Sequence, residues 1–477
     1  MAAAPDAVSA APSTAGHGSA QRPRPRRTGA HAILADCRMD GYPEHAGRLL
    51  VRGGSRLNGD VVLSGAKNSA LKLMAASLLT AEPCAIRRVP RISDVDTMVA
   101  MLHALGAGVV HDGDELLVTA GPGLSGCAPY ELVRTMRASI IVMGPLVARL
   151  GEATIAMPGG CNIGPRRIDF HLRGLEKLGA SIRIDHGFIK VACERLRGAV
   201  VALDYPSVGA TENLLMAATA ADGETVIENA AREPEIADLC AFLRGMGAVI
   251  EGAGTSTVRV EGGHPLHGVD HTVIADRIEA GTYLIMGAAC GGDVTARGLD
   301  PVHLELFLTK LGEMGVVVDV GDHTIRVRRD GRLAPVDVST LPHPGFATDL
   351  QAQMMVLLSL AEGTSIVTEN VFENRFVVVD ELNRLGAGIT TSGHHAVVAG
   401  PRSLTGTVVE APDLRGGAAL ITAGLIADGV TEVRGVHHID RGYEDIGGKL
   451  GALGAGVERV DMPAEAPHGS ASRAAGA

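Results

Sequence analysis

The chain has 477 residues, 46% of them hydrophobic and 20% charged, which suits a globular protein of two to four domains. Its net charge of −11 excludes general binding to nucleic acid, and 3% aromatic residues without tryptophan argue against a base-stacking surface. The seven cysteines are scattered without a Cys-x-x-Cys pair, which excludes a disulfide framework and indicates a reducing, cytoplasmic location. No uninterrupted apolar run reaches the ~18 residues of a membrane-spanning helix.

The two ends of the chain differ in composition from the rest. Residues 1–45 are rich in Ala, Pro, Ser and Arg, which predicts a disordered extension, and residues 463–477 predict a similar flexible tail. Arg26 and Arg27 are not followed by the apolar segment of a twin-arginine export signal. We therefore expect the folded part to lie between these two ends.

The first motif in the folded part is Gly65-Ala66-Lys67-Asn68-Ser69, which precedes an apolar helix. A lysine and an amide at a helix N-terminus suit an anion, because unpaired backbone N–H groups point the same way. The glycine spacing of a P-loop is absent. A capped helix start explains the segment almost as well.

A tripeptide of the Leu-Gly-Ala type recurs six times, with successive glycines 68 to 73 residues apart. Each copy ends an amphipathic stretch and is followed by alternating residues, which predicts a helix, a left-handed glycine cap and a strand. The glycines are Gly106, Gly179, Gly247, Gly315, Gly386 and Gly454. We expect six strand–helix–strand–helix–strand units of about 70 residues, which favours two similar three-unit α/β domains with a cleft between them over a solenoid.

The loop from Met157 to Arg167 is the most informative local pattern. Glycine and proline surround Cys161, and Arg166 and Arg167 follow. Such loops open and close over ligands, and the two arginines would favour a thiolate or clamp a phosphate or carboxylate. The alternative is a surface loop with an inert thiol.

Other charged residues lie at expected element boundaries. Arg137, Arg415 and Arg441 each follow this pattern; one alone is most often a structural arginine, whereas several together make a dianion pocket. Asp349 follows a turn-rich loop, so it is either a helix N-cap or a general base. The two His-His pairs lack the spacing of a helical metal site, so we expect no metal.

Together these segments resemble the bacterial UDP-N-acetylglucosamine 1-carboxyvinyltransferases, which are enolpyruvyl transferases. The resemblance runs from about Gly47 to Val460, and its most specific pieces are the segments around Lys67, Arg137 and Cys161, Pro206–Glu212, Ala231–Glu235, Asp276–Glu279 and His438–Glu444. It implies two inside-out α/β barrel domains, each of three βαβαββ-type repeats, with the active site in the interdomain cleft. The implied domains are residues 46–66 plus 275–462, and residues 67–274, which carry the Cys161 loop.

The resemblance also implies the reaction: transfer of the enolpyruvyl group of phosphoenolpyruvate to the 3-hydroxyl of UDP-N-acetylglucosamine, with release of phosphate and without a cofactor. Lys67, Arg137, Arg166 and Arg415 match cations around phosphoenolpyruvate. Cys161 matches the proton donor to the enol methylene, which also forms a phosphoenolpyruvate adduct and is alkylated by fosfomycin. Asp349 matches the base for the 3-hydroxyl, and Asp413 a further active-site carboxylate. The other implied substrate-binding positions are Asn68, Arg167, Ile168, Asp169, Ser207, Val208, Gly209, Glu233, Asp276 and Val371.

One residue departs from the family pattern, because Arg167 stands where the family usually has proline. It adjoins the nucleotide, so acceptor identity is less strongly indicated than reaction class, although the extra guanidinium could equally pair with a surface carboxylate. Two alternatives therefore stay open: a paralogue that acts on another nucleotide such as UMP in nucleoside-antibiotic biosynthesis, and a noncatalytic UDP-sugar sensor. The related enzyme for shikimate 3-phosphate lacks the Pro-Gly-Gly-Cys loop, which argues against that acceptor.

Overall fold

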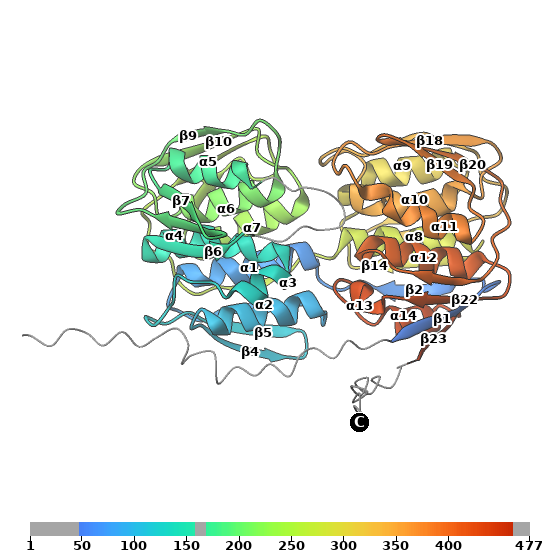
Figure 1. Cartoon of the computed structure of the whole chain (residues 1–477), viewed down its shortest axis with the longest axis horizontal. Helices are drawn as coiled ribbons and strands as arrows, with labels where there is room; N and C mark the ends of the chain where they lie inside the picture. The colour runs from blue at the N-terminus through green and yellow to red at the C-terminus, as the bar shows by residue number, and fades with distance from the viewer. Residues whose placement is uncertain (1–46, 158–167, 461–477) are drawn as a thin grey trace, which may run out of the picture. The chain divides into compact units, whose positions relative to one another are not determined.

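The computed structural model describes residues 47–157 and 168–460. Their strands form six sheets, five of four strands and one of three (Figure 1). Buried apolar side chains form two clusters. The first core draws on residues 66–273, and the second core draws on residues 49–63 and 275–453. Within the described ranges, no helix is long and apolar enough to cross a membrane.

The first core contains three sheets and seven α-helices of the described chain. In sheet order its strands are β13 (Asp270–Thr272), β3 (Cys84–Arg87), β5 (Glu115–Thr119) and β4 (Gly108–Asp112); β6 (Glu152–Ala156), β8 (Phe188–Ala192) and β7 (Ser181–Asp185); and β11 (Val249–Glu251), β12 (Thr257–Glu261), β10 (Glu224–Glu228) and β9 (Val200–Ala202). Its α-helices are α1 (Lys67–Ala76), α2 (Ser93–Ala104), α3 (Tyr130–Thr135), α4 (Met143–Leu150), α5 (Asp169–Lys177), α6 (Val208–Ala218) and α7 (Pro234–Gly245). The 3-10 helices, labelled η, are η1 (Ser77–Leu79) and η2 (Arg137–Val142).

The second core also contains three sheets and seven α-helices of the described chain. In sheet order its strands are β15 (Val317–Gly321), β16 (Thr324–Arg328), β14 (Asp293–Arg297) and β2 (Asn58–Val62); β17 (Val338–Ser339), β18 (Thr364–Thr368), β20 (His395–Ala399) and β19 (Ile389–Ser392); and β21 (Val408–Glu410), β22 (Val430–Arg434), β1 (Arg48–Arg52) and β23 (Gly456–Val460). Its α-helices are α8 (Arg277–Ala289), α9 (Glu305–Glu313), α10 (Gln351–Leu358), α11 (Val379–Arg384), α12 (Leu414–Ile426), α13 (Val436–Ile439) and α14 (Ile446–Ala452). Its 3-10 helices are η3 (Pro301–Leu304), η4 (Thr348–Leu350) and η5 (Arg375–Val378).

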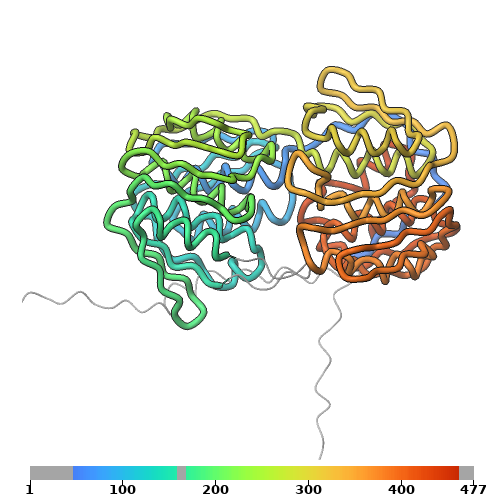
Figure 2. Tube along the Cα trace, turned by 90° about the horizontal axis from the view of Figure 1, so that it is seen from above, coloured from blue at the N-terminus to red at the C-terminus, as the bar shows by residue number. Residues whose placement is uncertain are grey.

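The sheets share one topology. In each four-stranded sheet one edge strand runs parallel to its neighbour and the other pairs are antiparallel. The three-stranded sheet is antiparallel. At its edge strand β6, a single parallel bridge between Cys127 and Thr154 takes the place of the parallel edge strand of the other sheets. β1 and β2 enter sheets of the second core, where Figure 2 shows their blue trace among orange and red segments.

Helices at the centre of each core are buried on nearly every side. All thirteen residues of α8 are buried, and it packs on α10 and α12, which are also buried over most of their length. A helix without a polar stripe belongs in an interior, which explains the apolar sequence of these segments. Figure 1 shows α8, α10 and α12 side by side, with the strands of the second core at its outside.

The six recurrent glycines end helices in the predicted way. Their φ angles lie between 89° and 106°, in the left-handed region. In each case the glycine N–H bonds to the carbonyl three residues back, and the next N–H bonds to the carbonyl five residues back, as at Gly106 and Ala107. This pair of bonds is the Schellman motif, so the predicted glycine caps are confirmed.

The chain passes between the two cores through two adjacent segments. The N–H of Ala66 donates to the carbonyl of Ile274 at 2.7 Å, and the N–H of Asp276 donates to the carbonyl of Ser64 at 3.0 Å. A Cβ at Gly65 would lie 1.8 Å from the carbonyl oxygen of Arg88, so only glycine fits. This close pairing brings the starts of α1 and α8 together.

Candidate active site

Lys67 is the first residue of α1 and its side chain is buried in an ion triplet. Its Nζ lies 2.7 Å from Oδ2 of Asp94 on α2, and Oδ1 of Asp94 accepts from Nε of Arg441 at 2.9 Å. Burial lowers the pKa of Lys67, the charges of Arg415 and Arg441 lower it further, and Asp94 opposes them. Burial acts to raise the pKa of Asp94, but Lys67 and Arg441 outweigh it and the net shift is downward. We call Lys67, Asp94 and Arg441 the first triplet.

The backbone at Lys67 is also held by a carboxylate. Its N–H points to Oδ2 of Asp276 at 3.3 Å, while Oδ1 of Asp276 caps α8 by accepting from the N–H groups of Ile278 and Glu279. Gly442 packs on the lysine, since a Cβ there would lie 3.3 Å from Lys67 Cδ. The predicted anion site thus begins at a helix start that has no side-chain cap of its own.

Asp349 lies between two arginines in a second ion triplet. Its Oδ1 accepts from Nη2 of Arg375 at 2.7 Å, and its Oδ2 accepts from Nε and Nη2 of Arg415 at 3.3 and 3.2 Å. The residue belongs to η4, and neither it nor Thr348 caps a helix there. The N-cap alternative is therefore wrong for Asp349, whose two carboxylate oxygens accept from the arginines instead. Arg375, Asp349 and Arg415 are the second triplet.

Arg415 stands at the start of α12 and is buried. Its guanidinium lies 5.3 Å from the ring centroid of Tyr443, and its Nη1 has no hydrogen-bond partner among the described residues. Burial acts to lower the pKa of Arg415, but Tyr443 and Asp349 outweigh it and the net shift is upward. Asp413 caps α12, because its Oδ1 accepts from the N–H groups of Arg415 and Gly416 at 2.8 and 3.0 Å.

A second group of candidates surrounds a buried histidine on α5. Asn213 on α6 donates through Nδ2 to Nδ1 of His171 at 2.7 Å, and its Oδ1 accepts the N–H of Gly144 at 2.7 Å. Burial, assisted by the charge of Arg137 on η2, lowers the pKa of His171 to about 4. Neutral His171 fills the space beside Gly209, where a Cβ would lie 3.1 Å from its Cε1.

The remaining candidates of this group stand at helix starts. Ser207 caps α6 by accepting the N–H of Ala210 at 3.4 Å, and Val208 is the first residue of that helix. Ile168 and Asp169 begin α5, where Asp169 pairs with Arg173 one turn later. These residues and Arg137 come from three neighbouring elements of the first core.

A third group joins the two cores through buried charges. Nε and Nη2 of Arg277, on α8, donate to the two carboxylate oxygens of Glu235 on α7, at 3.2 and 3.4 Å. Burial acts to raise the pKa of Glu235, but Arg277 outweighs it and the net shift is downward. Glu233 accepts the N–H of His343 at 3.2 Å, and burial raises the pKa of Glu233.

Other predicted residues are outside these groups. Cys161, Arg166 and Arg167 lie outside the described residues. The N–H of Val371 donates to Oε1 of Glu369 at 2.7 Å, so this backbone is fixed by a buried carboxylate. Sequence reasoning missed Asp94, Arg375 and Glu235 as ion partners. Of these three, only Glu235 belongs to a motif named in the sequence analysis, Ala231–Glu235. Its ion partner, Arg277, is 42 residues away in the sequence.

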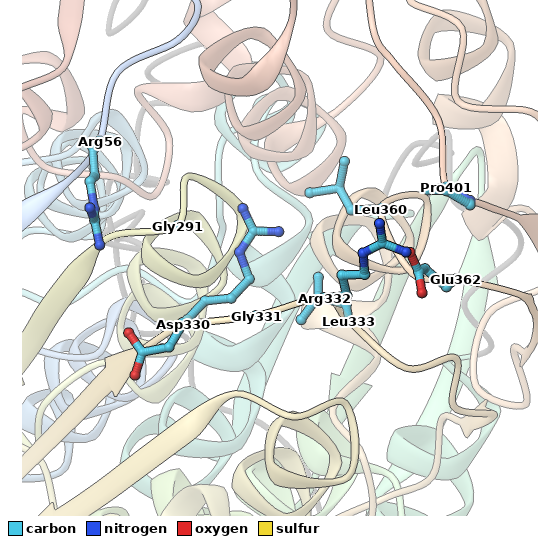
Figure 3. Close-up of a pocket in the computed structure, with 10 residues that line it drawn as sticks. Arg56, Gly291, Asp330, Gly331, Arg332, Leu333, Leu360, Glu362 and Pro401 are labelled. Atoms are coloured by element: carbon cyan, nitrogen blue, oxygen red, sulfur yellow. The ribbon is translucent and has the colours of Figure 1, made fainter.

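A hollow of about 550 Å³ lies on the surface of the second core, away from all these residues (Figure 3). Two of its lining residues, Arg332 and Glu362, form an ion pair at 2.5 Å, and Arg56, Arg329 and Asp330 add further charges. Its lining is mostly exposed and carries charges of both signs. Among the described residues, no cluster of three or more His, Cys, Asp or Glu side chains could hold a metal ion.

Comparison with known proteins places this chain among enolpyruvyl transferases. The model of the EPSP synthase (3-phosphoshikimate 1-carboxyvinyltransferase) family matches residues 51–450. UDP-N-acetylglucosamine 1-carboxyvinyltransferase 2 of Carboxydothermus hydrogenoformans is 53% identical over 415 residues, which cover 87% of this chain and 99% of that protein. The UDP-N-acetylglucosamine 1-carboxyvinyltransferase of Gloeobacter violaceus is 52% identical over 421 residues, covering 88% and 92%.

Solved structures show the same fold. The enolpyruvyl transferase NikO from Streptomyces tendae superposes with a TM-score of 0.80 at 28% identity, covering 88% of this chain and 100% of that one. EPSP synthase from Acinetobacter baumannii has a TM-score of 0.69 at 18% identity, covering 87% and 100%, and this likeness bears on the fold alone. The predicted mixed α/β fold of this type is confirmed.

Proposed function

The chain belongs to the UDP-N-acetylglucosamine 1-carboxyvinyltransferases of the enolpyruvyl transferase family, and from this membership we propose its reaction. It transfers the enolpyruvyl group of phosphoenolpyruvate to the 3-hydroxyl of UDP-N-acetylglucosamine and releases phosphate, the first committed step of peptidoglycan precursor synthesis. The main support for this proposal is a relative of that name that is 53% identical to this chain over 99% of its own length.

The finer architecture in this proposal is two inside-out α/β barrels, each of three repeats. The first barrel comprises residues 46–66 plus 275–462, and the second comprises residues 67–274. The shared sheet topology, the six Schellman glycines and the two separate cores support this division. The active site would then lie in the cleft between the barrels, next to the paired segments at Gly65 and Ala275.

The chemistry requires a base for the hydroxyl and an acid for the enol carbon. The 3-oxygen attacks C2 of phosphoenolpyruvate while C3 gains a proton, and the tetrahedral adduct then loses a C3 proton and phosphate to restore the double bond. We assign the base role to Asp349, because Arg375 and Arg415 orient both of its oxygens. Cys161 would supply the proton to C3.

The cations would replace water around the phosphate and the carboxylate of phosphoenolpyruvate. Lys67 and Arg415 each belong to a triplet that carries one more positive than negative charge. Arg137 and Arg166 complete the proposed phosphoenolpyruvate site. Fixed cations in a water-poor site stabilise charge that develops on the leaving phosphate. Asn68, Ser207, Val208, Gly209, Asp169 and Val371 would bind the UDP-sugar, with Ile168, Arg167, Glu233 and Asp276 beside them.

The proposed setting is the cytoplasm, where both substrates are made. The partners are the two small molecules, and the acidic chain is expected to bind no nucleic acid. No cofactor is assigned to the reaction.

Phosphate release from phosphoenolpyruvate tests the proposal, with UDP-N-acetylglucosamine, UMP or shikimate 3-phosphate as acceptor. We expect release with UDP-N-acetylglucosamine. Release with UMP alone would assign the chain to the secondary-metabolic role that Arg167, which departs from the family pattern, leaves as the second candidate. Binding of UDP-N-acetylglucosamine without release from any acceptor would indicate a sensor.

A further inference from the structure

Lys72 is a buried cation on α1 that the proposed reaction does not use. It follows Asn68 by one helical turn, and its Nζ donates to the carbonyl oxygen of Asn68 at 2.7 Å. Long side chains in helices lean toward the helix N-terminus, so the ammonium reaches the first turn of α1. Oε1 of Glu212, on α6, lies 3.6 Å from the same Nζ, and the Glu212 side chain is fully buried.

Helix stability alone does not explain this placement. A cation in the first turn opposes the helix dipole, and its burial removes water as well. Lys67 already places one ammonium in that turn, and the rest of α1 is mainly apolar. A buried ion pair is often no more stabilising than apolar side chains of the same volume. Stability is therefore a weak explanation for the pair, and the bond from Lys72 to the Asn68 carbonyl points to the first turn of α1.

We propose that Lys72 and Glu212 form a positioning pair that fixes the first turn of α1, and so aligns Asn68 and Lys67 for substrate binding. This inference rests on the proposed function. Lys72 acts through the Asn68 carbonyl and is not itself a catalytic residue. Two neighbouring contacts hold the same turn: the Lys67 N–H faces Asp276, and the Ser69 hydroxyl donates to Asp238.

The surroundings of Glu212 make the lysine its necessary partner. Neither carboxylate oxygen has a hydrogen bond among the described residues. Burial raises the pKa of Glu212 to about 7, Lys72 opposes this shift, and Glu235 on α7 and Glu233 just before it add to the shift. Two of the elements packed against α6 also carry Arg137, on η2, and His171, on α5, which is neutral because its pKa is lowered to about 4. Lys72 is thus the one cation within ion-pair distance of Glu212 in the described structure.

The test compares Lys72→Met and the double variant Lys72→Met/Glu212→Leu with the wild type. Lys310→Met is the matched control, because it removes an exposed pair with Glu313 on α9. We expect both test variants to raise the KM for UDP-N-acetylglucosamine about tenfold while kcat changes less than threefold. The dissociation constant for UDP-N-acetylglucosamine, measured by calorimetry, should rise in parallel, and the control should match the wild type.

The double variant decides between positioning and stability. It leaves no unpaired buried charge, so we expect it to fold with a Tm close to that of the wild type even if Lys72→Met alone does not fold. A double variant with wild-type Tm and a KM and dissociation constant within twofold of the wild type would overturn the inference. Absence of phosphate release from the wild type would instead reject the proposed function, and the ratio of dissociation constants would still test the pair.

Discussion

The two ion triplets carry the same charges but have opposite exposure. In the first, the carboxylate of Asp94 is 5% exposed while Lys67 and Arg441 are 11% and 31% exposed. In the second, the carboxylate of Asp349 is 24% exposed while Arg375 and Arg415 are only 4% and 5% exposed. Each has two cations and one carboxylate, so the difference lies in which group is accessible to a ligand.

The two triplets have equal net charge, but their opposite exposure suits them to different chemistry. A buried carboxylate between more accessible cations serves as a counter-ion, so the first triplet suits the binding of an anion. An accessible carboxylate held by two buried arginines has a fixed orientation, which suits it to accept a proton from a bound hydroxyl. Four predictions break or sharpen this comparison.

Removal of the accessible carboxylate should have the largest effect. We expect Asp349→Asn to lower kcat by about 10³-fold, because a neutral amide cannot take the hydroxyl proton. Phosphate release measures this, and calorimetry with UDP-N-acetylglucosamine should show affinity within threefold of the wild type. Asp380→Asn, on α11, is a control that should keep wild-type kcat. A kcat within tenfold of the wild type would remove Asp349 from the role of base.

Removal of the buried counter-ion should weaken anion binding and shift its pH dependence. Burial already lowers the pKa of Lys67, and Asp94 opposes that shift. In Asp94→Asn this opposition is lost, so the lysine loses its proton at lower pH than in the wild type. We expect kcat/KM for phosphoenolpyruvate to fall about 30-fold at pH 8, and its alkaline limb to move to lower pH. An unchanged alkaline limb would show that Lys67 does not control it.

Glu212 shows what happens to a buried carboxylate with one cation instead of two. The net pKa shift is downward for Asp94, whereas the pKa of Glu212 rises to about 7. A raised folded-state pKa gives stability that is present below the unfolded pKa and is lost as pH rises through 7. Relative to the wild type, Glu212→Gln should therefore gain about 2 kcal/mol more unfolding free energy at pH 8 than at pH 5. Urea unfolding at both pH values measures this, and equal differences would contradict the raised pKa.

Local features of this molecule were predictable from sequence, whereas its ion triplets were not. The glycine caps depend on hydrogen bonds within six residues, so the local sequence around Gly106 is enough to predict the cap. Asp94 and Arg441 are 347 residues apart, and Asp349 and Arg375 are 26 apart, so these pairs exist only after the sheets assemble. The N-cap alternative for Asp349 failed for the same reason, because two distant arginines use the carboxylate.

The smallest effect is expected from changes in α9 and its glycine cap, which lie outside the two triplets. Gly315 has φ +89°, whereas Gly312, inside α9, has an ordinary helical position with no atom near an added Cβ. We expect Gly315→Ala to lower the unfolding free energy by about 1 kcal/mol, because alanine is strained in the left-handed region. Gly312→Ala should raise it by about 0.5 kcal/mol through helix propensity. Urea unfolding measures both values, and neither variant should change kcat/KM by more than twofold, since α9 carries no residue of either triplet. Loss of activity in a stably folded Gly315→Ala would mean that the helix caps, as well as the triplet charges, set the geometry of the site.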